Sequence, residues 1–184
     1  MESDKPYNHG TMTESQYLGF IRSALRSKWL RWIPRSKALE AVKRLYSGSN
    51  PRQKVEYQCA ICKGYGSSKE MEVDHYPCDA GSILSVEDIG QFCKNLFCEV
   101  DNLRVLHKSC HKIYTHAQRK GISYEDSQIE KEIILIEQQE SLDDILNFLY
   151  SYGYSEIQVS NTKKRRACMV EVFTNITKGE HCGT

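Results

Sequence analysis

The feature that most constrains this chain is a repeated spacing between residues that bind metal ions. Cys59 and Cys62 form one pair, and His107 and Cys110 form a second pair 45 residues further along. A tetrahedral zinc ion takes four ligands of these types at about 2.0–2.3 Å, and a tight turn delivers two at a time. The spacing therefore predicts a structural zinc that joins the start of a small core to its end and contributes folding free energy.

Because the chain has further cysteines, the sequence alone does not settle the identity of the fourth zinc ligand. The chain has eight cysteines, and its first residues lack the apolar stretch of an export signal. In a reducing compartment a C-x-x-C pair indicates metal binding rather than disulfides. The spacing favours His107, but Cys78, Cys93 or Cys98 can take its place if His107 is simply exposed. Cysteines that bind no metal, including Cys168 and Cys182, are predicted to be buried thiols.

Charge is unevenly distributed along a chain whose net charge is only +1. Residues 13–56 carry ten basic and three acidic side chains, whereas residues 125–184 carry eleven acidic and six basic ones. The basic segment is expected to face a polyanion, the alternative being an ordinary solvated surface. No apolar run is long enough to span a membrane, so we expect a cytoplasmic protein without a membrane partner.

Apolar periodicity predicts a mostly helical α+β fold. Four segments are expected: a flexible tail at 1–12, a basic helical arm at 13–54, a core at 55–120, and a C-terminal region at 121–184 made of helices and a β-hairpin. The arm and core are predicted to hold helices over 14–29, 36–46, 86–96 and 109–119, and strands over 55–58, 71–75 and 102–106. The C-terminal region is predicted to hold two helices, then strands at 157–159 and 169–172 around a basic turn at 161–166.

Three further elements lie between and beside the two ligand pairs. They are the dipeptide Asp74-His75, then Asn102 followed by leucine, and His111 directly after Cys110. This order of residues resembles the HNH endonucleases, in particular the zinc-containing sort common in bacteriophage genomes. The resemblance covers residues 55–118, about a third of the chain. It implies a β-hairpin packed on a helix around one divalent ion (the ββα-metal core), and cleavage of DNA to a 5′ phosphate and a 3′ hydroxyl.

The resemblance also implies a role for each residue. Asp74 and His111 would bind the catalytic ion, His75 would be the general base, and Asn102 would brace the hairpin and help to orient the base. A histidine with a pKa near neutrality suits proton abstraction from water. A carboxylate and an imidazole together accept Mg²⁺, Mn²⁺ or Ni²⁺.

The sequence departs from the usual family pattern in two respects. The family commonly has cysteine where His107 stands, and 26 residues separate His75 from Asn102, more than in minimal members. Some members also carry a further metal-binding histidine at the position of Thr115. Here His116 lies one residue away, about 100° around a helix, and we expect at most a phosphate contact from it.

DNA contacts are expected from the basic arm and from the core. The candidates are Arg22, Arg26, Arg31 and Arg35 in the arm, and Arg104 and Lys108 beside the metal site, with the turn at 163–166 as a second contact. Trp29 is predicted to pack in the core and Trp32 to stack on DNA. Two alternatives stay open: a zinc-stabilised DNA-binding module without nuclease activity, and a regulator that binds a host protein. A homodimer and a host or phage protein partner are also left open.

Overall fold

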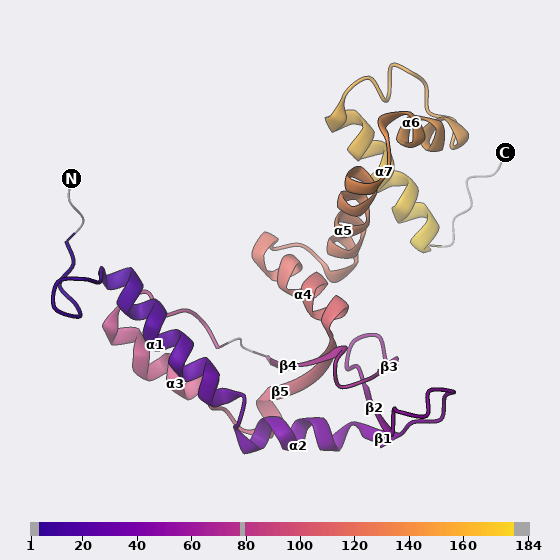
Figure 1. Ribbon diagram of the computed structural model, residues 1–184. Helices are drawn as coiled ribbons and strands as arrows, with labels where there is room; N and C mark the ends of the chain where they lie inside the picture. The colour runs from indigo at the N-terminus through magenta and orange to yellow at the C-terminus, as the bar shows by residue number, and fades with distance from the viewer. Residues whose placement is uncertain (1–3, 78–79, 179–184) are drawn as a thin grey trace. The chain divides into compact units, whose positions relative to one another are not determined.

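The computed structural model describes residues 4–77 and 80–178 of the chain. They form a mostly helical α+β fold, as predicted, with two compact units that divide after His111. Among the described residues, no helix combines the length and the apolar character that crossing a membrane requires. Figure 1 labels the helices and strands in chain order.

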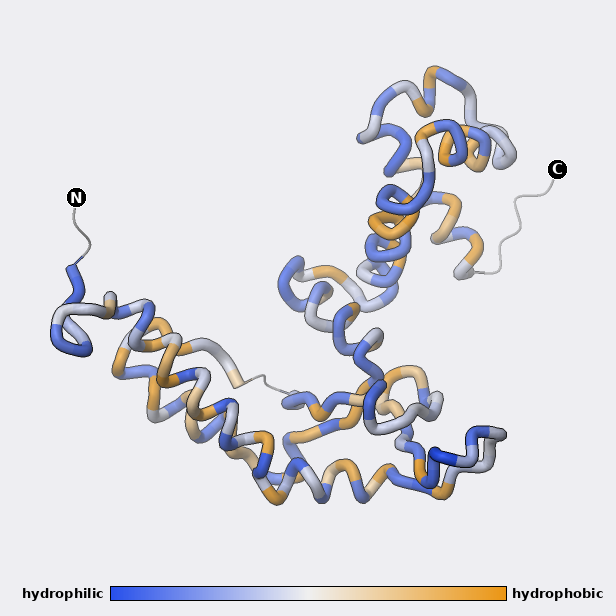
Figure 2. Tube along the Cα trace, in the orientation of Figure 1, coloured by the Kyte–Doolittle hydropathy of each residue, from blue (hydrophilic) through white to orange (hydrophobic). Residues whose placement is uncertain are grey.

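The first helix, α1 (Glu14–Trp29), begins where the sequence predicts. Thr13 and Gln16 form a reciprocal capping box, with the Thr13 amide 2.9 Å from the Gln16 side-chain oxygen. The helix lies beside α3 (Ile89–Leu96) (Figure 1), and hydrophobic positions, orange in Figure 2, recur along both helices. Their shared core consists of Leu18, Ala80, Ile83, Phe92 and Leu96. The segment before α1, expected as a tail, includes a turn in which Tyr7 stacks on Tyr17 with ring centroids 4.3 Å apart.

The predicted helix over 36–46 is wrong in both of its bounds. The helix observed is α2 (Ile33–Ala41), which takes Pro34 into its first turn, where the missing N–H of proline costs no hydrogen bond. The chain then forms β1 (Lys43–Leu45), which pairs antiparallel with β2 (Val55–Gln58). The periodicity of residues 42–45 fits a helix or a strand equally well, and pairing with β2 makes this segment a strand. A short third strand, β3 (Tyr65–Gly66), completes this sheet on the other side of β2.

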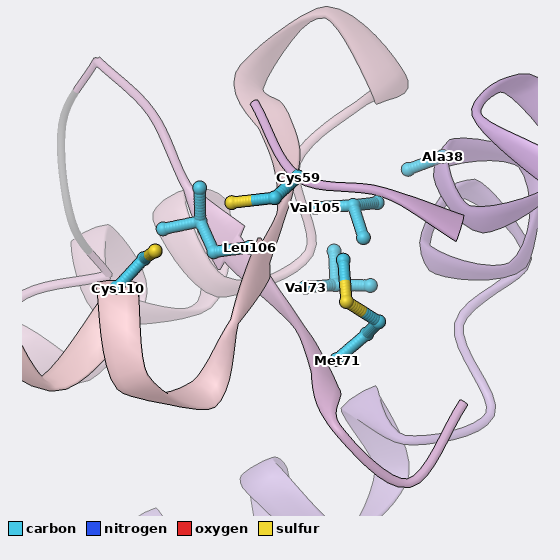
Figure 3. Close-up of a cluster of buried hydrophobic side chains, with 7 residues drawn as sticks. All are labelled: Ala38, Cys59, Met71, Val73, Val105, Leu106 and Cys110. Carbon is cyan, nitrogen blue, oxygen red and sulfur yellow. The ribbon is translucent and has the colours of Figure 1, made fainter. Parts of the chain in front are cut away.

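The centre of the first unit is an antiparallel pair, β4 (Met71–His75) and β5 (Leu103–His107), in which Met71 faces His107 and His75 faces Leu103. One face of this pair presents Met71, Val73 and Val105, and the same buried cluster includes Leu106 of β5, Cys59 and Cys110 (Figure 3). Helix α4 (Lys108–Lys120) follows β5 without an intervening loop.

The other predictions in this unit are confirmed to within a few residues. The strand predicted over 102–106 starts one residue later, because Asn102 ends a short 3₁₀ turn, η2 (Val100–Asn102). The helix predicted over 86–96 opens as a 3₁₀ turn, η1 (Val86–Asp88), before α3.

The second unit is built from α5 (Tyr124–Gln139), α6 (Leu142–Ser151) and α7 (Thr162–Lys178). The first two match the predicted helices, and the serines before them, Ser123 and Ser141, cap their N-termini. The predicted hairpin is wrong, because 162–178 is a helix. Asn161 accepts a hydrogen bond from the Lys164 amide at 3.0 Å and so starts that helix. Of the residues that suggested strands, Val172 is buried, whereas Ile157 and Val170 are exposed. The core of this unit consists of Ile129, Ile133, Ile145, Leu149, Val159, Cys168 and Met169.

Candidate metal centre and the adjoining polar site

Cys59, Cys62, His107 and Cys110 meet at one point, here called the cysteine–histidine cluster. Their ligand atoms all lie within 4.8 Å of one another. Tetrahedral bonds of 2.0–2.3 Å place ligand atoms about 3.5 Å apart, so only a small contraction is needed to surround one ion. The cluster can therefore bind a metal ion such as zinc, and the prediction that these four residues lie together is confirmed.

The first two ligands lie on a tight turn that follows β2. The Lys63 amide donates to the Cys59 carbonyl at 3.0 Å, and the Cys59 amide donates to the Gly64 carbonyl at 2.9 Å. Lys63 adopts a left-handed backbone conformation with φ of 60°, which is uncommon outside glycine and marks how sharply the chain folds back. The Ala60 amide donates to the Val105 carbonyl at 2.8 Å and attaches the turn to β5.

Cys59 is prepared to act as a thiolate. Its side chain is fully buried, and burial by itself would raise its pKa. Hydrogen bonds from the amides of His107, Cys62 and Ile61 outweigh burial and lower the pKa of Cys59 to about 6. The His107 amide lies 3.3 Å from the sulfur. Thiolate is the form of cysteine that binds metal ions, so these amides favour metal binding before any ion arrives.

Gly66 leaves the room that the His107 ring occupies, and Nδ1 of that ring lies 3.2 Å from Cys62 Sγ. A Cβ atom on Gly66 would lie 2.7 Å from His107 Nε2, closer than real contacts allow. A Cβ atom on Gly64 would lie 3.5 Å from the ring, an ordinary contact. The cluster thus requires glycine at position 66, although this residue supplies no metal ligand. No spacing in the sequence identifies it.

The other described cysteines do not join the cluster. Cys98 lies 3.7 Å from the Asn102 carbonyl, and burial raises the pKa of its thiol. Cys93 is half-buried, and Cys168 is buried in the second unit. Cys78 and Cys182 lie outside the described residues.

A second polar group lies on the face of β4 opposite the core. His111, in the first turn of α4, places Nε2 3.3 Å from Asp74 Oδ1 and Nδ1 2.6 Å from Glu72 Oε2. We call Glu72, Asp74 and His111 the carboxylate–histidine group. The structure thus brings together Asp74 and His111, which the sequence singled out. Glu72 was missed, although its place two residues before Asp74 puts it on the same face of a strand.

Arg104 completes the surroundings of Asp74 from the facing position on β5. Its Nε and Nη2 donate to Asp74 Oδ2 at 3.0 and 2.9 Å, and its guanidinium lies 4.4 Å from the centre of the Tyr76 ring. The structure therefore places Arg104, expected as a DNA contact, in an ion pair whose two side chains are only 14% and 13% exposed.

These contacts shift the two titrating groups in opposite directions. Burial would raise the pKa of Asp74, but hydrogen bonds from His111 and Arg104 outweigh it and hold the pKa below its ordinary value. The hydrogen bond to Asp74 raises the pKa of His111 against the opposing effect of burial, and Glu72 adds to the rise. The group therefore attracts positive charge to the place between its two carboxylates.

His75 lies apart from this group, because neighbouring residues on a strand face opposite sides. Its Nε2 is 3.0 Å from the Leu96 carbonyl, and its ring centroid is 5.0 Å from that of Trp29. A carbonyl only accepts hydrogen bonds, so Nε2 carries the hydrogen and the neutral ring keeps its lone pair on Nδ1. Asn102, the predicted brace, has an exposed side chain, and its carbonyl accepts from the Tyr76 amide at 2.9 Å next to His75.

The other sequence candidates lie in different settings. Arg22, Arg26, Arg31 and Lys108 are exposed, whereas Arg35 is half-buried with its guanidinium 5.3 Å from the centre of the Trp29 ring. His116 lies in the second unit, where its Nε2 is 2.8 Å from Glu130. The basic residues 163–166 belong to the first turns of α7 rather than to a turn between strands.

Comparison of the chain with protein-family models, with curated proteins and with solved structures finds no match.

Proposed function

We propose that this protein is a metal-dependent DNA endonuclease of the HNH, or ββα-metal, type. The observation that carries the proposal is the 3.3 Å distance between Asp74 Oδ1 and His111 Nε2. Two ligands of one Mg²⁺ ion, each about 2.1 Å from it, lie about 3 Å apart when they are neighbours in an octahedron. A pair of antiparallel strands that runs directly into a helix supplies both residues.

The donor set fits a catalytic divalent ion. A carboxylate oxygen and an imidazole nitrogen accept Mg²⁺, Mn²⁺ or Ni²⁺. When bound, such an ion neutralises negative charge on the phosphate oxygens and on the leaving 3′ oxygen. Glu72 accepts the Nδ1 hydrogen of His111, which leaves Nε2, the nitrogen nearest to Asp74, as the atom that would bind an ion once its own hydrogen is displaced. Such a carboxylate partner commonly supports metal-binding histidines.

His75 is the proposed general base. With Nε2–H held by the Leu96 carbonyl, Nδ1 is the atom that takes a proton from water. The water oxygen then bonds to phosphorus while the bond from phosphorus to the 3′ oxygen breaks. That oxygen leaves and gains a proton, which yields a 5′ phosphate and a 3′ hydroxyl.

The basic arm is the proposed DNA-binding surface. Arg22, Arg26 and Arg31 are exposed on and just after α1, and the last residue of that helix, Trp29, contacts His75. The end of α1 therefore lies next to the proposed base. Because contacts of arginine with phosphate release counterions from DNA, binding should weaken steeply as salt rises. The reduced cysteines that the cluster needs fit a cytoplasmic location.

The proposal is tested by cleavage of supercoiled plasmid with the purified chain in Mg²⁺ or Mn²⁺. We expect nicking by the wild type, and a loss of at least roughly 100-fold in rate for His75→Ala and for Asp74→Asn. His116→Ala is the matched control, because it removes a histidine of α4 that pairs with Glu130 instead. Zinc content should stay unchanged in the histidine variants, and both should remain folded with only a small fall in melting temperature, because each loses the contacts of one side chain. Wild-type protein that cleaves no DNA under any divalent ion, or full activity in His75→Ala, would overturn the proposal.

One observation favours a second candidate, a zinc-stabilised DNA-binding module without nuclease activity. Arg104 neutralises Asp74 through two hydrogen bonds to the same oxygen, so one of the carboxylate oxygens is already engaged. This candidate predicts salt-sensitive DNA binding that persists in Asp74→Asn, with no cleavage product.

A further inference from the structure

The candidate base is contacted by an aromatic residue from outside the hairpin–helix core. Trp29 ends α1, and its ring lies 5.0 Å from that of His75 with 31° between the planes. Trp29 also packs against both apolar clusters of the first unit. The basic arm thus reaches the candidate base through a specific side chain.

The hydrogen bond to Leu96 leaves one freedom of the His75 ring unrestrained. A single hydrogen bond at Nε2 fixes the position of that nitrogen. It still allows the plane of the imidazole ring to rotate, which would move Nδ1. A flat, packed surface against the ring removes this freedom. The Trp29 indole supplies such a surface, so the carbonyl and the indole together fix the direction in which Nδ1 points.

The indole of Trp29 is held at this place by packing and not by hydrogen bonding. Its Nε1–H is buried and meets no acceptor in the described part of the chain. The Arg35 guanidinium, 5.3 Å from the centre of the ring, adds a cation–π contact that helps to fix the indole. The face of this ring, rather than its polar edge, is therefore what the arm presents to His75.

Trp32, three residues further along the same arm, is held differently. Its Nε1 donates to the Cys98 carbonyl at 2.8 Å, and its ring meets that of Phe97 edge-on with centroids 5.4 Å apart. The structure thus engages within the fold a tryptophan that was expected to stack on DNA. Because Trp32 fastens the arm without contacting His75, it offers a control for the role of Trp29.

We propose that Trp29 is a positioning residue for His75, and this inference rests on the proposed nuclease function. The indole face sets the plane of the imidazole, so that Nδ1 points to the place where water is deprotonated. Trp29 does not itself touch the reacting atoms. Its role makes the N-terminal arm a part of the candidate active site as well as a DNA-binding surface.

The experiment compares Trp29→Met, which keeps most of the apolar bulk but loses the flat face, with Trp29→Phe, which keeps a flat face. We expect Trp29→Met to lower kcat for plasmid nicking about 10- to 100-fold with KM within about twofold, because small misplacements of a reacting group cost this much. Trp29→Phe should stay within about fivefold of the wild type. Trp32→Leu is the matched control on the same arm, and it should reduce the melting temperature while kcat is retained.

Nuclear magnetic resonance of the labelled His75 ring gives a readout that needs no activity. The ring current of Trp29 should displace the His75 signals, and Trp29→Met should abolish that displacement. Trp29→Met with wild-type kcat, or His75 signals that do not move, would overturn the inference while leaving nuclease activity intact. Absence of cleavage by the wild type would instead overturn the proposed function, and the His75 signals would still report whether Trp29 holds the ring.

Discussion

The cysteine–histidine cluster and the carboxylate–histidine group share helix α4, which supplies Cys110 to the first and His111 to the second, yet their chemistry differs. In the cluster, four ligand atoms converge within 4.8 Å, and main-chain amides stabilise the Cys59 thiolate. In the carboxylate–histidine group, the two nitrogens of His111 face different carboxylates, and Arg104 already neutralises Asp74. The first is complete in protein ligands. The second offers two, and under the proposed function the remaining positions would be taken by water and phosphate.

This difference is the one expected between a structural metal site and a reactive one. A closed tetrahedral site has no position for substrate, so its ion contributes to folding only. An incomplete set of harder ligands binds more weakly, but it admits the phosphate on which chemistry takes place. If the comparison is right, changes to the first site alter folding, and changes to the second alter activity.

Removal of a cluster ligand is the most severe way to test the comparison. Cys59→Ser should lose zinc and unfold much of the first unit, because a structural zinc contributes on the order of 10 kcal/mol. Metal analysis and circular dichroism melting check this outcome. Asp74→Asn should keep its zinc. A Cys59→Ser protein that melts like the wild type would show that the cluster does not hold the fold together.

The second largest effect is expected at Glu72. Glu72→Gln keeps the shape of the side chain but weakens its hydrogen bond to His111 Nδ1. Loss of such support commonly costs about 10- to 100-fold in metal affinity or activity. The Mg²⁺ concentration that half-activates plasmid nicking should rise by that factor while zinc content is unchanged. An unaltered Mg²⁺ dependence would show that Glu72 does not support metal binding by His111.

A smaller effect should follow from crowding the His107 ring. Gly66→Ala places a methyl group 2.7 Å from His107 Nε2, so the ring must shift and zinc affinity should fall by roughly tenfold. Gly64→Ala is the matched control, because its methyl group meets the ring at an ordinary 3.5 Å. Competition with a chromogenic chelator measures both affinities. Equal affinities in the two variants would contradict this account of how His107 is placed.

The smallest effect is expected at Glu130, which pairs with His116 outside both candidate metal sites. Glu130 contacts Lys120 and His116, and these hydrogen bonds, that of Lys120 first, lower the pKa of Glu130 below its ordinary value of 4.5. Its contribution to stability is therefore present above pH 4.5 and is lost as the pH falls through the lowered value. Glu130→Gln should cost about 0.5–1 kcal/mol at neutral pH, measured by urea unfolding, and should leave zinc content and Mg²⁺ dependence unchanged.

Sequence reasoning located the ligands because metal sites depend on residue types at short spacings. Cys59, Cys62, Asp74 and His111 could be found in this way, as could strands that alternate buried and polar residues. Gly66 could not, since its importance comes from the room it leaves for a ring on another strand. Contacts between distant segments, such as Trp29 with His75, also leave no trace in spacing.

The errors in the fold have a related cause. Residues 162–178 contain β-branched side chains that suit a strand, but the Asn161 cap and the apolar contacts of the second unit favour a helix. Residues 43–45 fit a helical period, yet they pair with β2. In both segments the structure depends in part on contacts with other elements, which a local pattern does not contain.

Cys110 and His111 are consecutive, and His107 ends the strand just before them. Neighbouring positions on a helix point about 100° apart. At this junction, Cys110 therefore points to the cysteine–histidine cluster and His111 to the carboxylate–histidine group. Substitutions elsewhere in the junction can be accommodated, but the insertion or deletion of a single residue would turn one side chain away from its partners. The length of this junction should therefore tolerate far less change than its composition.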